Sequence, residues 1–412
     1  MKKLGVIGGG ITGCITALHA VKKGYEVTLF EKDKILGGIL KDTKFNEDIF
    51  FNSCQYFNPE EPWYKEYIQN EFNFKIFDHE KGSYTNIFDN EVFSNQVPNP
   101  TYDKKLNLSE VFKQENFNKK ESLSERLNCY PEIVSKSIKK WIDGHEVDSN
   151  HLSWDHPNGF ACGRVFFDKH IEEIKILKKK FPFLDKILCL PDRYRDIDLS
   201  ISKVSVPKNG FNDFFDNLKI YLEKNNVKLN MATVIKPIWE KNNLTISCNG
   251  KKYLFDKIFW SGNPTGLIKS YGLPLLDSLN ISSRNLHFNL KGKLKNNFYL
   301  QIFSKDHPIS RVYFYNLNQR PKLTVETFLR DFVDIDIVNF CKKIIKKFKL
   351  DLDFFNDNSD VEEVQKKYVV VSSRDKRIIS DFILKTKNSN LIPGCWLIYA
   401  RDMKIQHVLN NI

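Results

Sequence analysis

The hydrophobic pattern of the first thirty residues predicts a strand, a turn, a helix and a second strand. Residues 4–7 form a short apolar run, residues 8–13 are rich in glycine, and an apolar stretch with helical spacing continues to Lys23. A second β-rich run at residues 26–30 is followed directly by Glu31. Short apolar runs joined by a helix are typical of parallel strands in an α/β sheet.

A second stretch has the order helix, strand, hairpin and buried strand. Asn249-Gly250 lies between two apolar runs and is a hairpin signal, because both turn positions require a positive φ. Small residues at 261–264 end the last strand. We expect an amphipathic helix from about residue 211 to Lys224 and strands at 227–229, 234–238, 244–247, 253–255 and 257–260.

The closing block predicts one more strand and a final helix. Residues 390–396 are expected to run as a strand into a turn, and residues 399–403 open a helix that continues through Leu409. Between these three blocks lie residues 81–203 and 267–365.

The inserted segments have their own pattern. Residues 298–302 and 311–315 are predicted to be paired strands, and residues 131–141 to be helical. From Ile335 to Leu350 apolar residues recur at helical spacing opposite a lysine-rich face. Packing of this helix against the core with a solvated basic face is favoured over a membrane-surface helix.

Three spaced glycines in the first turn predict a bound dinucleotide. Gly8 allows a tight turn, Gly10 allows the backbone to approach a pyrophosphate, and Gly13 allows close packing of helix on strand. The phosphates are expected at the helix N-terminus, where unpaired N–H groups favour negative charge. Glu31 lies about 20 residues further on, where a carboxylate accepts hydrogen bonds from a ribose diol.

Composition is that of a globular enzyme. The chain has 412 residues, of which 41% are hydrophobic and 28% charged, enough for two or three domains with sizeable cores. Eight scattered cysteines form no Cys-x-x-Cys pair, so we expect reduced thiols, no metal site and a cytoplasmic location rather than secretion. No apolar run is long enough to span a bilayer, so the sequence predicts no integral membrane segment. The net charge of +12 is spread along the sequence, which favours an anionic small-molecule substrate over nucleic acid.

A second group of glycines, a neighbouring pair, narrows the choice of cofactor. Gly37-Gly38 follows Glu31 closely and allows another backbone segment to pass near a bulky dinucleotide. This spacing resembles the FAD-binding pattern of the amine-oxidase-like flavoproteins, which include monoamine oxidases, protoporphyrinogen oxidases, phytoene desaturases and UDP-galactopyranose mutases. The resemblance implies FAD rather than NAD, and a Rossmann-like FAD-binding α/β domain assembled from residues 1–80, 204–266 and 366–412. It also implies that residues 81–203 and 267–365 form an inserted α+β substrate domain.

The same resemblance implies the positions of further site residues. Residues 50–57 correspond to a segment that passes near the flavin ring, with Ser53 and Cys54 in place of the usual glycines. Val234 would meet the adenine through its backbone, and the closing helix would direct its N-terminus at the flavin C2 carbonyl. The implied cofactor-binding residues are Gly8, Gly10, Ile11, Thr12, Gly13, Glu31, Lys32, Gly38, Val234, Ser261, Gly262, Gly394, Asp402 and Met403.

The closing helix and several arginines are most similar to the mutase branch. Asp402-Met403 matches that branch, whereas Cys395 stands where it has an arginine, and covalent attachment of flavin to Cys395 is disfavoured. The planar fork of arginine makes bidentate bonds to a diphosphate. The substrate candidates are Arg311, Arg164, Arg193 and Tyr399, with Arg195 competing with Arg164.

Three functions fit these residues. The arginines favour a flavoenzyme acting through flavin N5 on a nucleotide sugar or a related anionic substrate, without net oxidation. The first alternative is an FAD-dependent oxidase or dehydrogenase of a C–N or C–C bond, and the second is a flavin-binding scaffold without turnover. No catalytic acid or base is identified, and His151, His156 and His287 are expected to be hydrogen-bonded structural residues.

Overall fold

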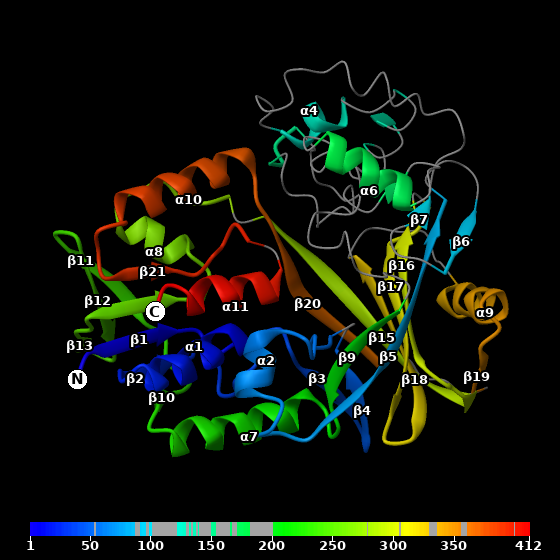
Figure 1. Ribbon diagram of the computed structural model, residues 1–412, viewed down its shortest axis with the longest axis horizontal. Coiled ribbons are helices and arrows are strands. Elements are labelled where there is room, and N and C mark those ends of the chain that lie inside the picture. Colours follow the sequence, from blue (N-terminus) through cyan, green and yellow to red (C-terminus); the bar gives the residue numbers. More distant parts are fainter. Residues whose placement is uncertain are drawn as a thin grey trace.

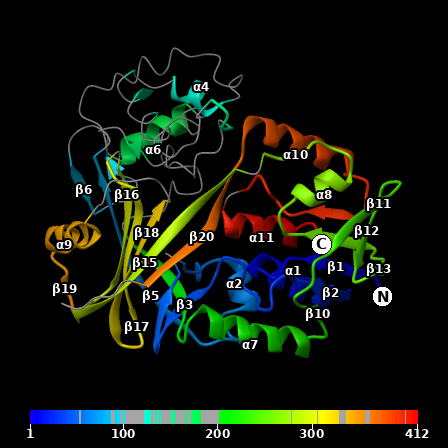
Figure 2. The same cartoon turned by 180° about the vertical axis from the view of Figure 1, so that it is seen from behind.

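The protein, described here by a computed structural model, contains two large sheets side by side (Figures 1 and 2). We call them the nucleotide sheet and the lid sheet. Both chain termini lie in the part built on the nucleotide sheet (Figure 1). The described residues are 1–52, 55–86, 91–95, 99–100, 122–128, 132, 135–136, 139, 150–153, 165–166, 171–181, 201–277, 279–304, 306–328, 336–355, 361–398 and 400–412.

The nucleotide sheet is parallel throughout, in the order β10-β2-β1-β14-β21. Strands β1 and β2 are apolar and almost entirely buried, as expected for strands covered on both faces. This arrangement confirms the Rossmann-like α/β fold. The strands are β1 (Lys3–Ile7), β2 (Glu26–Phe30), β10 (Lys228–Asn230), β14 (Lys257–Trp260) and β21 (Leu391–Pro393).

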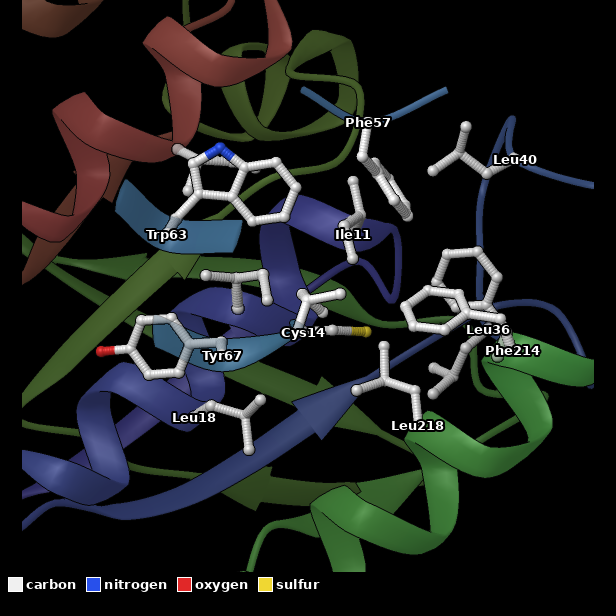
Figure 3. Close-up of a cluster of buried hydrophobic side chains, with 14 of the residues drawn as sticks. Ile11, Cys14, Leu18, Leu36, Leu40, Phe57, Trp63, Tyr67, Phe214 and Leu218 are labelled. Carbon is white, nitrogen blue, oxygen red and sulfur yellow. The ribbon is translucent and has the colours of Figure 1, made fainter. Parts of the chain in front are cut away.

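Alternate side chains of these strands enter two separate cores. Val6 and Phe259 pack with the helices of one face, while Ile7 and Trp260 pack against the other. The first face is covered by α1 (Ile11–Lys22), α2 (Pro62–Tyr67), α7 (Phe211–Lys224) and α11 (Arg401–Leu409), whose interlocking side chains appear in Figure 3. The second face is covered by α8 (Thr265–Ser270), α10 (Ser373–Lys385) and the hairpin sheet β11 (Lys236–Glu240), β12 (Asn243–Cys248) and β13 (Lys251–Tyr253).

The lid sheet has nine strands, with β19-β15-β18-β17-β16-β5-β6 in order, β20 beside β15 and β9 beside β5. The predicted pairing of 298–302 with 311–315 is confirmed, since Phe298 lies opposite Phe314 and Gln301 opposite Arg311. The strands are β5 (Phe74–Thr85), β6 (Val92–Ser94), β9 (Ile201–Pro207), β15 (Leu279–Lys293), β16 (Asn297–Phe303), β17 (Ile309–Leu317), β18 (Arg320–Phe328), β19 (Asp351–Phe354) and β20 (Val361–Val370).

One face of the lid sheet is apolar and is covered by α9 (Ile337–Lys347), on the side away from the nucleotide sheet (Figure 1). Cys341, Ile344 and Ile345 of α9 are buried against it, whereas the lysines of this helix are exposed. The prediction of a core-packed helix with a solvated basic face is therefore confirmed. Within the described ranges, no helix is long and apolar enough to cross a bilayer.

Short elements complete the description. A hairpin of β3 (Asp42–Phe45) and β4 (Asp48–Phe51) lies against the lid sheet, where the Tyr315 hydroxyl accepts a hydrogen bond from the Phe51 backbone N–H at 3.0 Å. The predicted helix at 131–141 lies mostly outside the described residues. The remaining elements are β7 (Asn99–Pro100), α4 (Leu123–Leu127), β8 (Val165–Phe166) and α6 (Ile171–Lys180).

Helix α7 is capped by a residue from a distant part of the chain. Its own N-cap residue, Gly210, has φ 96° and no side chain that could accept a hydrogen bond from the first turn. Asp42 takes that role: its Oδ2 accepts a hydrogen bond from the Asn212 backbone N–H at 2.8 Å. Burial raises the pKa of Asp42 to about 6, although the backbone hydrogen bonds oppose the shift. The hairpin and the start of α7 are thereby joined through a buried carboxylate, whose charged form is destabilised by desolvation.

This carboxylate predicts a pH-dependent stability. Because the pKa of Asp42 is higher in the folded state, folding binds a proton, so the free energy of unfolding falls as pH rises from about 4 to about 6. Asp42→Asn keeps an oxygen acceptor and removes the ionisable group. The free energy of unfolding of this variant should therefore lack the decrease of about 3 kcal/mol across this pH range. Urea unfolding of both proteins between about pH 3.5 and 7.5 measures the difference, in steps of about half a unit. Parallel pH profiles for the two proteins would contradict the assignment.

Candidate flavin site

The glycine turn after β1 is packed too closely for side chains at two positions. A Cβ atom on Gly13 would lie 1.9 Å from the Gly8 carbonyl oxygen. Gly8 itself has φ 104°, and its Cβ would lie 3.3 Å from the backbone nitrogen of Gly262. The turn therefore brings the start of α1 and the end of β14 together around it.

Gly10 differs from these two glycines because it faces open space. It is the N-cap of α1, with no side chain to cap the first turn, and a Cβ added to it would meet no atom within 4 Å. Ile11 and Thr12, the first residues of α1, contribute N–H groups at this end. An anion can therefore approach the positive end of the helix dipole here.

The second glycine pair lies beside this turn, where the sequence places it. The Gly37 backbone N–H donates to the Gly9 carbonyl oxygen at 2.9 Å, and Gly37 forms a parallel bridge with Gly10. Gly37 and Gly38 have φ of 121° and 62°, so both positions require glycine-like freedom. A second main-chain segment thus lines the open side of Gly10.

Glu31 occupies the end of β2 beside the glycine turn. Its side chain is 7% exposed; Oε2 accepts the Gly9 backbone N–H at 2.6 Å and Oε1 accepts the Asp33 N–H at 2.9 Å. A carboxylate accepts about four hydrogen bonds, so each oxygen can take a further donor such as a ribose hydroxyl. The two backbone N–H groups fix its orientation.

Val234 and Lys32 lie next to Glu31. The Thr233 backbone N–H donates to the Glu31 carbonyl oxygen at 2.8 Å, which places Val234 at this edge with its side chain 79% exposed. The Lys32 side chain is exposed and lies 3.6 Å from the Asp33 carboxylate. A nucleotide base on this edge would cover exposed apolar surface of Val234.

The ends of β14 and β21 close the other side of the turn. The backbone N–H groups of Ser261 and Gly262 both donate to the Ile7 carbonyl oxygen, at 2.8 and 3.2 Å. A Cβ atom on Gly394 would lie 2.0 Å from the Trp260 carbonyl oxygen, and Trp396 Nε1 donates to the Gly262 carbonyl oxygen at 3.0 Å. These residues hold the strand ends together.

The N-terminus of α11 is held against α2. Trp63 Nε1 donates to Asp402 Oδ1 at 3.2 Å, while Met403 is 51% exposed. Helix α11 begins after Ala400, a residue without a capping group, and Asp402 is the acidic residue of its first turn, so the carboxylate offsets part of the positive end of the helix dipole. Tyr399, a predicted substrate residue, lies outside the described residues.

Arg401 is a functional candidate that the sequence analysis missed. Its guanidinium donates to the Tyr56 carbonyl oxygen and lies over the Phe57 ring, 5.0 Å from the centroid. Burial lowers the pKa of Arg401, with the Asp402 carboxylate opposing the shift. A cation in the first turn of a helix opposes the helix dipole, and this was the available sequence signal.

Cys395 lies in the turn before α11, with φ 56° and a buried side chain. Burial raises the pKa of its thiol to about 11, partly offset by Lys404. A protonated thiol is a poor nucleophile, which agrees with disfavouring covalent attachment of flavin. Of the other described cysteines, Cys14, Cys248 and Cys341 are also buried and free. Cys54 and its neighbour Ser53 lie outside the described residues.

The face of the lid sheet toward the nucleotide sheet is polar. In-register pairs place Asn285, Glu326, Arg311 and Gln301 in one row across four strands. The next row contains His287, Thr324, Tyr313 and Tyr299. The sheet is therefore two-faced, apolar under α9 and lined with polar side chains on the other side.

Arg311 is oriented by a fully buried carboxylate. Glu326 Oε1 accepts from Arg311 Nε at 3.0 Å and lies 2.7 Å from Arg311 Nη2. Glu326 is 0% exposed, so the pair holds the guanidinium in one direction on the polar face. The partner Glu326 was not predicted from sequence. Arg164, Arg193 and Arg195 lie outside the described residues.

The described histidines on this face are neutral. His287 Nδ1 lies 2.9 Å from Thr324 Oγ1, and burial lowers the pKa of His287 to about 3. The hydrogen-bonded structural role predicted for His287 is confirmed. His79 is fully buried among Tyr56, Tyr299 and Tyr313, and burial lowers its pKa to about 3. His156 lies outside the described residues.

Residues 3–60 match a protein family described as FAD dependent oxidoreductase. A reduced UDP-galactopyranose mutase shares the fold, with TM-score 0.65 and 12% identity over 100% of this chain and 93% of that one. A putative protoporphyrinogen oxidase from Exiguobacterium sp. 255-15 gives TM-score 0.60 and 10% identity over 100% and 97%. Wild-type putrescine oxidase bound to putrescine gives TM-score 0.60 and 10% identity over 100% and 98%.

The chain shares the fold of these flavoproteins, and the match of residues 3–60 indicates FAD as the cofactor. Its match to a curated relative is short: 42 residues are 57% identical to 4,4'-diapolycopen-4-al dehydrogenase from Metabacillus indicus, spanning 10% of this chain and 9% of that protein. The family match supports an FAD-dependent oxidoreductase.

The residues of this flavoprotein fit FAD. The open space at Gly10 and the uncapped first turn of α1 would accept the pyrophosphate, and Glu31 would accept the ribose hydroxyls. Exposed Val234 and Met403 provide apolar surface at the two ends of this region.

Replacing Gly10 by alanine tests the pyrophosphate position. Alanine suits φ −70° and its methyl group meets no atom of the protein, so the free energy of unfolding without cofactor should change by less than about 1 kcal/mol. The methyl would fill the space needed by the pyrophosphate, so FAD affinity should fall by more than about tenfold. Flavin fluorescence titration measures the affinity. Gly266→Ala, in open space on α8, is the control, and unchanged affinity in Gly10→Ala would refute this position.

Proposed function

We propose that this flavoprotein acts on an anionic substrate, with a nucleotide sugar as the first candidate, held between the polar face of the lid sheet and the flavin. The observation that supports this most is the Arg311–Glu326 pair. A buried carboxylate that bonds to Nε and Nη2 fixes the plane of the guanidinium, and a fixed planar fork suits a diphosphate.

The position of the hairpin β3–β4 supports the same site. Asn52, at its end, accepts a hydrogen bond from Asn285 Nδ2 at 2.7 Å, and Asn285 is the neighbour of Glu326 in register. The chain that continues from Asn52 is the segment expected beside the flavin ring. Arg311 lies in the same row as Asn285, two strands further on, and this row therefore contacts the chain that leads to the proposed flavin position.

Bound FAD would supply either a hydride acceptor or, when reduced, a nucleophile at N5. The chain's own contribution is electrostatic. The first-turn N–H groups of α11 and the partly buried Arg401 would favour negative charge on the flavin. His79 and His287 are neutral and add no positive charge to the polar face.

Oxidation of a C–N or C–C bond is the second candidate. It is favoured by the match of residues 3–60 to FAD dependent oxidoreductases and by the shared fold of putrescine oxidase. Anaerobic titration separates the three functions. An oxidase substrate such as putrescine should bleach the oxidised flavin, whereas a mutase should convert UDP-galactopyranose only after prior reduction and consume no oxidant. A scaffold should bind FAD and do neither.

Arg311→Lys tests the proposed substrate site. Lysine retains the charge beside Glu326 but loses the fork, so KM for UDP-galactopyranose should rise at least about tenfold, the range of one lost charged hydrogen bond. Arg320→Lys, at the exposed end of β18, is the matched control. Steady-state kinetics of the reduced protein, with FAD content and melting temperature checked, give the comparison. Equal KM values for the two variants would contradict a role for Arg311.

A further inference from the structure

A groove of about 890 Å³ lies at one end of the lid sheet, apart from the proposed flavin site. It is formed where β5 begins, where β9 ends, and at the turns that follow β15 and β17 (lower end of the sheet in Figure 1). The glycine turn and Glu31 belong to the nucleotide sheet and do not line it. Neither the proposed substrate site nor the cofactor accounts for this groove.

Four lysines line the groove from two opposite sides. Lys75 and Lys208 come from β5 and from the end of β9, while Lys293 and Lys295 come from the end of β15 and the turn after it. All four are exposed, and within the described residues none of them forms an ion pair. Asp351 is the single acidic residue among the described lining residues.

The backbone fixes the position of one of these lysines, Lys293. Gly292, just before Lys293, has φ 103°, and a Cβ on it would lie 2.1 Å from the Asp351 carbonyl oxygen. Lys293 pairs with Asp351 in the β15–β19 ladder. The close approach of the two strands therefore fixes where Lys293 leaves the sheet.

The base of the groove is apolar. Val206, Leu294 and Leu317 are buried hydrophobic residues of the lining, and Pro207 and Pro321 extend this surface. Unpaired ammonium groups around an apolar base are complementary to a molecule with an anionic end and an apolar body. Phosphate is the anion that carries enough charge to neutralise several lysines at once.

We propose that this groove binds a small phosphorylated molecule with an apolar portion, its phosphate held by Lys208, Lys293 and Lys295. The volume falls in the range of roughly 300–1,000 Å³ that is typical of small-molecule sites. A concave site favours a free phosphorylated molecule over the headgroup of a lipid in a flat membrane. The inference is independent of the proposed function because it uses neither the flavin nor the polar face.

The test uses the full-length, FAD-loaded protein and two kinds of probe. Phenyl phosphate carries the proposed chemistry, and vesicles of phosphatidylcholine with phosphatidylglycerol represent an anionic membrane. The site variant is Lys208→Ala/Lys293→Ala/Lys295→Ala. The control is Lys236→Ala/Lys251→Ala/Lys269→Ala, which removes the same charge from exposed, unpaired lysines of the nucleotide-sheet part. Calorimetric titration and vesicle sedimentation measure binding.

We expect wild type and control to bind phenyl phosphate equally and more tightly than inorganic phosphate, with at least tenfold loss in the site variant, about 1.4 kcal/mol. Asp351→Asn should tighten binding, because it removes the opposing charge without removing a lysine. Equal losses in site and control variants would overturn the proposal by showing a general charge effect. Absence of phenyl phosphate binding to wild type would also overturn it, and vesicle binding in that case would assign the surface to a membrane instead.

Discussion

The close approach of main chain to main chain at the first glycine turn is the constraint on which the rest of the site depends. With 1.9 Å between a Gly13 Cβ and the Gly8 carbonyl oxygen, any side chain there would push α1 away from β1. The same packing brings Gly262 to Gly8 and Gly37 to Gly9, so three distant segments meet at one helix N-terminus. Glu31 is oriented by the Gly9 N–H and therefore depends on that turn as well.

The lid sheet supports a polar surface in the interior of the protein. Its far face buries a continuous apolar core under α9, and this burial allows the near face to hold charged and hydroxyl groups. Polar groups on that face are then held by one another, as Glu326 holds Arg311 and Thr324 holds His287. The hairpin β3–β4 joins this face to the nucleotide sheet through Tyr315 and through Asp42 at α7.

Positive charge serves two different purposes in this arrangement. Arg311 and Arg401 are partly or largely buried and have defined partners, so their charge is directed at particular positions. The four lysines of the groove at the end of the lid sheet are exposed and form no ion pair with the described residues, so their charge has no fixed direction. The net charge of +12 therefore does not describe a uniform surface.

The sequence alone determined the β-α-β unit with its glycine turn, the FAD cofactor, the hairpin at Asn249-Gly250, the pairing of β16 with β17 and the burial of α9. These features lie within short, continuous segments of the chain, where periodicity and turn chemistry act directly. Only the tertiary structure decided that Glu326 orients Arg311, that Asp42 caps α7, that Arg401 contacts Tyr56 and Phe57, and that four lysines share one groove. Each of these joins residues far apart in the chain, and a single sequence contains no signal for which distant side chains will meet.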